Sequence, residues 1–126
     1  MDLTYSKELL KHFKHPKFVK DIKDASGVGE VGNMKCGDIM HLEIKVDEKT
    51  KKIKDIGFKT FGCPAAVAST DVVCGLAKGK TIAQAKALKK DDVIKKLKGM
   101  PPMKIHCSVL GIDALGVAIK DYESKK

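Results

Sequence analysis

The clearest regularity in the chain is an alternation of apolar and polar residues from Ile39 to Asp47. The apolar positions of this run share one face, and they are Met40, Leu42, Ile44 and Val46. A repeat of two residues is typical of a strand with one buried face. After a polar turn, Ile53 to Phe61 is predicted as a second strand with Ile56 and Phe58 facing the core. The two strands are expected to form an antiparallel hairpin.

Helical spacing replaces this alternation toward the N-terminus. Leu9, Leu10 and Phe13 recur at three- and four-residue intervals, which predicts a helix over residues 4–14. A His-Pro pair ends that run, and residues 16–23 are predicted as a second, shorter helical stretch.

Helices are also predicted throughout the C-terminal half. They cover Pro64–Lys78, a segment opened by Thr81 and Gln84, a segment from Asp91 or Asp92 to Lys98, and Ser108–Tyr122. Proline suits the first helical position of Pro64–Lys78, and Gly79 ends that helix. Thr81 and Gln84 have the spacing of a capping box. The last helix has an apolar stripe formed by Leu110, Leu115, Ala118, Ile119 and Tyr122.

The order of these elements indicates an α+β fold. We expect a small three-stranded antiparallel sheet with helices packed on one face and a long C-terminal helix. Residues 1–126 form a single domain, which begins with an N-terminal helical segment over residues 1–24. Residues 25–37 are rich in glycine and are predicted to be a loop with at most one short edge strand.

Charge narrows the range of partners. The formal net charge is +9, and all 25 basic residues are lysines. Specific reading of bases relies heavily on arginine, so no specific nucleic acid is expected, whereas an acidic protein partner is compatible with this charge. No apolar run reaches the about 18 residues of a membrane span. The N-terminus lacks the apolar core of a signal peptide, and a cytoplasmic protein is expected.

Three of the four cysteines fall at the ends of predicted elements. Cys36 lies in the glycine-rich segment, Cys63 between a strand and a helix, and Cys107 at the start of the last helix. The fourth, Cys74, lies in the middle of a predicted helix among apolar residues and is expected to be a small buried hydrophobe. The partial positive charge at a helix N-terminus favours the thiolate form of Cys63 and Cys107.

Two further ligand-type residues accompany these thiols. Asp38 stands two positions after Cys36, and His106 adjoins Cys107. Three thiolates with one carboxylate and one imidazole suit either Zn²⁺ or an iron–sulfur cluster. The other histidines, which are His12, His15 and His41, have no comparable company and are expected at the surface or at helix ends.

Around these residues the sequence resembles the iron–sulfur cluster assembly scaffold family of the IscU and NifU N-terminal type. The resemblance lies in the collinear blocks "GNMKCGDIMHLEIKVDE", "FKTFGCPAAVAS", "GKTIAQA", "MPPMKIHCSVLGIDAL" and "AIKDY". It spans nearly the whole chain, since "YSKELLKHFKHP" near the N-terminus fits as well.

The resemblance implies a scaffold, without enzymatic turnover of its own, on which a [2Fe-2S] cluster is built from iron and passed to apo-proteins. The implied ligands are Cys36, Asp38, Cys63, His106 and Cys107. Cys107 is the implied acceptor of persulfide sulfur from a cysteine desulfurase, and an electron donor such as a ferredoxin is implied as well. A segment like Met100–Lys104 is recognised by an Hsp70-type chaperone in some members, where leucine and valine occupy the positions of Met100 and Met103.

Several alternatives stay open at this point. The same ligands would suit a small zinc-binding protein with a structural or regulatory role, and zinc could also occupy the site of the isolated protein. A lysine-rich polyanion binder is a third reading. The fourth cluster ligand is Asp38, His106 or a group from a second chain, so homo-oligomer formation is open too.

Overall fold

The computed structural model describes residues 6–33, 38–61, 64–98 and 108–125. Three strands form one antiparallel sheet in the order β1-β2-β3, where β1 is Gly27–Asn33, β2 is Asp38–Asp47 and β3 is Lys52–Phe61. The predicted hairpin is therefore confirmed as β2 and β3. The edge strand β1 takes up seven residues of the glycine-rich segment.

The alternation along β2 determines which face of the sheet is buried. Met40, Leu42, Ile44 and Val46 are all nearly inaccessible to solvent. Ile53 and Ile56 on β3 are both fully buried although they are three residues apart. The pairing explains this spacing, because Lys45 lies opposite Asp55 while Val46 lies opposite Ile53. The additional residue on β3 forms a bulge, which returns both isoleucines to the core side.

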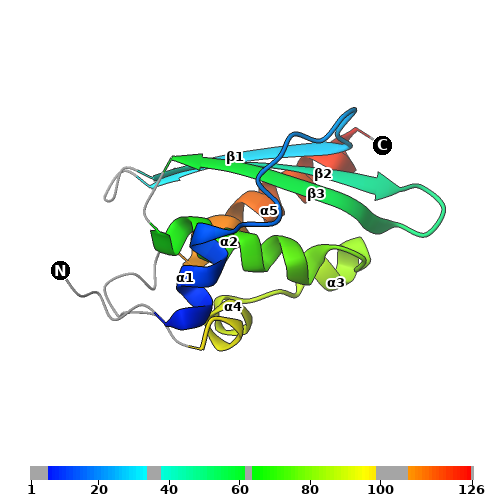
Figure 1. The fold of residues 1–126 in the computed structure, drawn as a ribbon. Helices are drawn as coiled ribbons and strands as arrows, with labels where there is room; N and C mark the ends of the chain where they lie inside the picture. The colour runs from blue at the N-terminus through cyan, green and yellow to red at the C-terminus, as the bar shows by residue number, and fades with distance from the viewer. Residues whose placement is uncertain (1–5, 34–37, 62–63, 99–107, 126) are drawn as a thin grey trace.

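Helices cover this buried face in two layers (Figure 1). They are α1 (Lys7–Lys14), α2 (Pro64–Ala77), α3 (Ile82–Lys86), α4 (Lys90–Lys96) and α5 (Ser108–Ser124). Helices α2 and α5 pack against the sheet, and α1 and α4 pack against α2 on its far side. The predicted α+β architecture, with helices on one face and a long C-terminal helix, is confirmed.

The predicted helix boundaries rest on local signals that the structure confirms. Gly79, after α2, adopts φ +87°, a left-handed conformation that favours glycine. The Thr81 hydroxyl accepts a hydrogen bond from Gln84 N at 3.2 Å, and Thr81 N donates to Gln84 Oε1 at 3.0 Å. This is the predicted capping box at the start of α3.

The short helix predicted over residues 16–23 is wrong. The segment contains no helix, its Val19 forms an isolated bridge with Phe58, and Phe58 N of β3 donates a hydrogen bond to Phe18 O at 2.9 Å. Farther along, Ile22 N donates to Glu43 Oε1 at 2.9 Å, and Ser26 N donates to Ile44 O at 2.7 Å. The segment thus crosses the sheet from the β3 side toward β1 (Figure 1), because its backbone groups pair with strand residues distant in sequence.

Two glycines allow α5 to approach β1 closely. A Cβ atom on Gly27 would lie 2.2 Å from Ala118 O, and one on Gly29 would lie 2.2 Å from Ala114 O. Asp121 of α5 also accepts a hydrogen bond from Val28 N at 2.9 Å. Gly27 faces Ala118 while the later residue Gly29 faces the earlier residue Ala114, so the strand and the helix run in opposite directions. Helix α5 therefore begins beside the end of β1.

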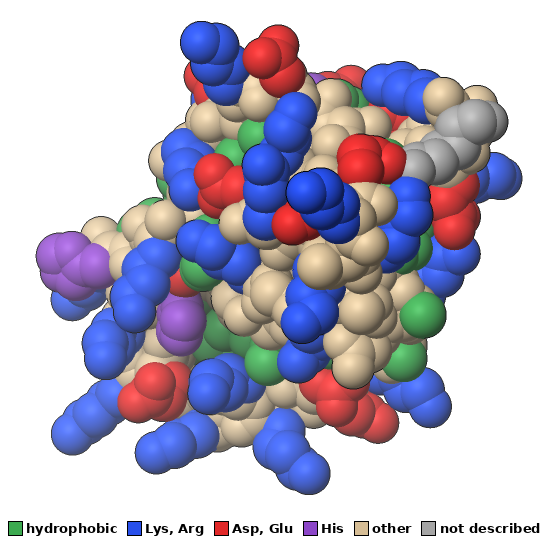
Figure 2. Space-filling model, turned by 90° about the vertical axis from the view of Figure 1, so that its right-hand side faces the viewer, with side chains coloured by type: hydrophobic (Ala, Val, Ile, Leu, Met, Phe, Trp, Pro, Cys, Tyr) green, Lys and Arg blue, Asp and Glu red, His purple; other side chains and the backbone are tan. Residues whose placement is uncertain are grey.

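The exterior is rich in lysine, as the charge predicted. On the face shown in Figure 2, lysine side chains are interspersed with carboxylates and do not form one continuous basic patch. Within the described ranges, no helix combines the length and the hydropathy that spanning a membrane requires.

Candidate metal centre

The structure describes the strand ends and helix starts that flank the predicted ligands, but it does not describe the ligand side chains. Cys36, Cys63, His106 and Cys107 lie outside the described residues, and only the backbone of Asp38 is described, as the first residue of β2. The ligand set therefore stays a prediction, and so does Met100–Lys104 as a chaperone segment, because it too lies outside the described residues.

The strand ends that flank Cys36, Asp38 and Cys63 in the chain lie at one end of the sheet. Asn33, the last residue of β1, pairs with Asp38, the first residue of β2. Ile39, the next residue of β2, pairs with Phe61, the last residue of β3. Partners in an antiparallel pair lie about 5 Å apart, so the chain enters and leaves residues 34–37 and 62–63 at neighbouring strand ends. Figure 1 shows these ends together on the left of the sheet.

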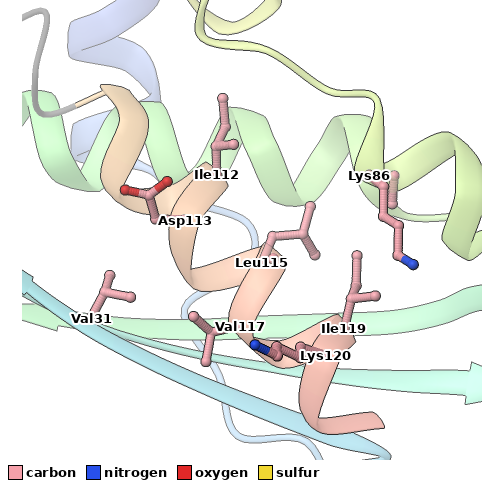
Figure 3. A pocket seen from close by; sticks show the side chains of 10 residues that line it. Val31, Lys86, Ile112, Asp113, Leu115, Val117, Ile119 and Lys120 are labelled. Carbon is pink, nitrogen blue, oxygen red and sulfur yellow. The ribbon is translucent and has the colours of Figure 1, made fainter. Parts of the chain in front are cut away.

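The two helices that follow ligand segments begin at the same end of the molecule. Helix α2 starts at Pro64, and two residues separate it from Phe61, the last residue of β3. Gly111, in the first turn of α5, packs on α2 so closely that an added Cβ atom would lie 2.8 Å from Thr70 Oγ1. Val31 of β1 and Asp113 of α5 line one cavity of about 590 Å³ (Figure 3), so an early turn of α5 lies near the end of β1.

The helix assignments support the predicted electrostatics of two thiols. Cys63 immediately precedes the 14-residue helix α2, and Cys107 immediately precedes the 17-residue helix α5. The N-terminal end of each helix carries about half a positive charge, which stabilises a thiolate or another anion there. Across the described ranges, no three His, Cys, Asp or Glu side chains are grouped so that they could hold a metal ion.

Cys74 is the described cysteine, and the structure confirms its assignment to the core. Its side chain is inaccessible to solvent in the middle of α2. Burial raises the pKa of the Cys74 thiol well above its ordinary value, and the negative charge of Asp71 adds to the rise. The group is therefore a neutral thiol, unlike the thiolates that bind metal.

Two histidines have partners that the sequence did not predict. His12 Nδ1 lies 2.6 Å from Asp71 Oδ2, and the Asp71 side chain is fully buried. His41 on the outer face of the sheet lies between two carboxylates, 3.2 Å from Glu30 Oε2 and 3.1 Å from Glu43 Oε2. Asp71 is 59 residues from His12, Glu30 lies on the neighbouring strand β1, and Glu43 lies two residues along β2 from His41.

The fold is that of a small α+β domain in which residues 34–37 and 62–63, which include Cys36 and Cys63, are joined to neighbouring strand ends at one end of the sheet. Comparison with known proteins identifies the family: residues 4–126 match the NifU-like N terminal domain. The chain belongs to this family.

Curated relatives carry names from iron–sulfur metabolism. The chain is 44% identical over 126 residues to the "Iron-sulfur cluster assembly scaffold protein IscU" of Aquifex aeolicus, which covers 100% of this chain and 80% of the relative. It is 49% identical over 121 residues to the "Iron-sulfur cluster assembly scaffold protein IscU 1" of Archaeoglobus fulgidus, covering 96% of this chain and 78% of that protein.

A solved structure agrees with the fold. A proposed iron–sulfur cluster assembly scaffold protein for the SUF system, from Fervidobacterium islandicum, superposes with a TM-score of 0.76 at 27% identity. The superposition covers 91% of this chain and 96% of that one. The predicted resemblance to the IscU and NifU N-terminal type is thereby confirmed.

Proposed function

We propose that this protein is a scaffold on which a [2Fe-2S] cluster is assembled and from which the cluster is transferred to apo-proteins. The observation that carries the proposal is the pairing of Asn33 with Asp38 and of Ile39 with Phe61. Chain connectivity limits Cys36 to about 7 Å from the Asp38 Cα, and Cys63 to a similar distance from Phe61. The start of α5, next to Cys107, lies at the same end of the fold.

The proposed ligands divide into a firm group and an exchangeable one. The thiolates of Cys36, Cys63 and Cys107 bind iron firmly, since iron–sulfur clusters are held mainly by cysteine. Asp38 offers a hard oxygen and His106 a nitrogen whose availability depends on pH. Replacing a fourth thiolate by either group makes the cluster easier to release, which suits cargo rather than a permanent cofactor.

Sulfur is proposed to arrive at Cys107. Its thiolate attacks the terminal sulfur of a persulfide on a cysteine desulfurase, which forms a persulfide on Cys107 and releases the desulfurase thiolate. Two electrons from an external donor such as a ferredoxin then reduce that sulfur to sulfide and restore the thiolate. The protein thus takes part in the chemistry without a catalytic cycle of its own.

The relatives' names support cluster assembly over the zinc-binding alternative, since both are named as scaffolds and neither as a zinc protein. Recognition of Met100–Lys104 by a chaperone and a cytoplasmic location stay predictions. So do the fourth ligand, the homo-oligomeric state and the division into a helical segment and a ligand loop. Within the predicted helical segment over residues 1–24, the structure describes a helix at Lys7–Lys14 and no helix over residues 16–23.

Anaerobic reconstitution tests the proposal directly. Protein supplied with ferrous iron, cysteine and a cysteine desulfurase is expected to develop the visible charge-transfer bands of a [2Fe-2S] centre. The assembled cluster should then move to an apo-ferredoxin, whereas protein loaded with zinc should stay colourless. Cys63→Ala should lose the bands while the matched Cys74→Ala variant keeps them. Colourless wild-type protein, or a cluster that never transfers, would contradict the proposal.

A further inference from the structure

A second cavity lies on the side of the fold formed by α1, α2 and α4. Its volume is about 230 Å³, and it is lined by residues of these helices and of the segment that follows α1. The polar groups around it come from His12, Lys17, Asp71 and Lys96. The apolar wall consists of Phe18, Val72 and Leu76.

Asp71 organises the inner end of this cavity. Its Oδ1 accepts hydrogen bonds from Lys17 N at 2.8 Å and from Phe18 N at 3.0 Å, and its Oδ2 lies 2.6 Å from His12 Nδ1. The buried carboxylate therefore has its hydrogen bonds satisfied and accepts a hydrogen bond from Nδ1 of the ring. Within the described chain no partner is assigned to the other ring nitrogen, Nε2 of His12, which is left for a ligand.

The charge around the cavity is positive. One carboxylate, Asp71, faces two lysines across the cavity, and three donors satisfy its hydrogen bonds. Lys17 and Lys96 form no ion pair with any carboxylate of the described ranges, although six other lysines do, namely Lys20, Lys51, Lys59, Lys78, Lys86 and Lys125. Two cations without a counter-ion beside a fixed imidazole and an apolar wall favour a ligand that is anionic at one end.

We propose that this cavity binds a small anion, a carboxylate or phosphate group carried on a short apolar body. The anionic group contacts Lys17, Lys96 and His12 Nε2, and the body packs on Phe18 and Leu76. The volume equals that of about eight water molecules at ~30 Å³ each, which limits the ligand to the size of a substituted benzene ring. Such a ligand would join α1, α2 and α4. The proposal is independent of the scaffold function.

The test uses the metal-free full chain and four probes of matched size or chemistry. Phenyl phosphate and phenylacetate combine an anion with an apolar body, whereas inorganic phosphate and benzyl alcohol each present only one of the two. Titrations are followed by the amide NMR signals of Phe18 and Gly75, at constant ionic strength because the chain carries a net charge of +9. We expect saturable shifts with at least one of the combined probes and much weaker binding of the two others.

Two variants localise the site. Lys96→Met keeps most of the side-chain stem but removes the charge, and it should weaken binding about tenfold, as expected for a charge-assisted hydrogen bond. Lys95→Met, on the same helix but outside the cavity, is the matched control and should bind like wild type. Gly75→Leu should abolish binding by filling the cavity without disrupting the fold, since an added Cβ atom there meets only Phe18 Cε2, at 3.6 Å.

Four outcomes would overturn the proposal. They are the absence of saturable binding by both combined probes, equal binding of benzyl alcohol or inorganic phosphate, an equal loss of affinity in Lys95→Met, and undiminished binding in Gly75→Leu. None of these outcomes bears on cluster assembly, which the reconstitution experiment tests separately.

Discussion

The contact between β1 and α5 permits a sharp test of how the fold holds the C-terminal helix. Gly29→Ala adds a Cβ atom that would lie 2.2 Å from Ala114 O and 2.6 Å from Ala118 N. Both neighbours are backbone atoms, so no side chain can rotate away, and α5 itself must shift. Intrinsic strand propensity favours alanine over glycine, so any loss of stability must come from this contact.

The expected cost follows from the geometry. Overpacking a core costs about 1–3 kcal/mol, and a backbone contact places this variant at the upper end, near 3 kcal/mol. With a urea dependence of about 1.5 kcal/mol/M, the unfolding midpoint should fall by about 2 M. Because α5 follows directly on Cys107, the displaced helix should also lower the yield of reconstituted cluster.

Gly116→Ala is the matched control on α5. Nothing lies within 4 Å of its added Cβ atom, and alanine is a better helix former than glycine. This variant should therefore gain about 0.5–1 kcal/mol. The chain contains no tryptophan, so unfolding is best followed by far-ultraviolet circular dichroism. A Gly29→Ala variant as stable as wild type, or a Gly116→Ala variant equally destabilised, would refute the reasoning.

Three further predictions concern titratable groups. Cys74→Ala should lose about 1–2 kcal/mol of stability yet keep cluster assembly. Loss of the cluster in a folded variant would show that Cys74 is wrongly assigned to the core. Hydrogen bonds from His41 to Glu43 and then Glu30 raise its pKa above the ordinary 6.5, against an opposing effect of burial. The stability that His41 contributes should be complete below pH 6.5 and disappear as the pH rises through its folded pKa. Urea midpoints of wild type and His41→Gln should therefore converge at high pH, and a pH-independent gap would contradict this assignment. Asp38→Ala should carry a longer-lived cluster, measured by the decay of its visible bands, because the exchangeable oxygen is removed; faster decay would argue against Asp38 as the labile ligand.

The elements predicted from the sequence are those whose signals are local. The alternation of Leu42 and its neighbours, the Thr81 capping box and the glycine after α2 each act within a few residues. The bulge between Ile53 and Ile56 is different, because it depends on the register of β3 against β2. The course of residues 16–23 across the sheet likewise depends on strand partners that follow it in the chain by tens of residues.

For the candidate site, the sequence predicts which residue types occur and at which ends of elements they stand. It does not predict that those ends meet, which follows from the pairing of Ile39 with Phe61 and from the antiparallel course of β1 and α5. Asp71 was missed for a related reason. A single carboxylate in an otherwise apolar helix has no local signature, and its partners His12 and Phe18 lie more than 50 residues away.

Helix α2 connects the two proposed sites physically. It begins immediately after Cys63, and the side chain of Thr70 meets the first turn of α5 at Gly111. The next residue, Asp71, holds His12 of α1 and borders the proposed anion cavity. A rigid element with these contacts at adjacent positions transmits a shift at one end to the other, because packed interiors yield little. An anion that tightens α1 on α2 should therefore raise the yield of reconstituted cluster, whereas Gly29→Ala is expected to lower it.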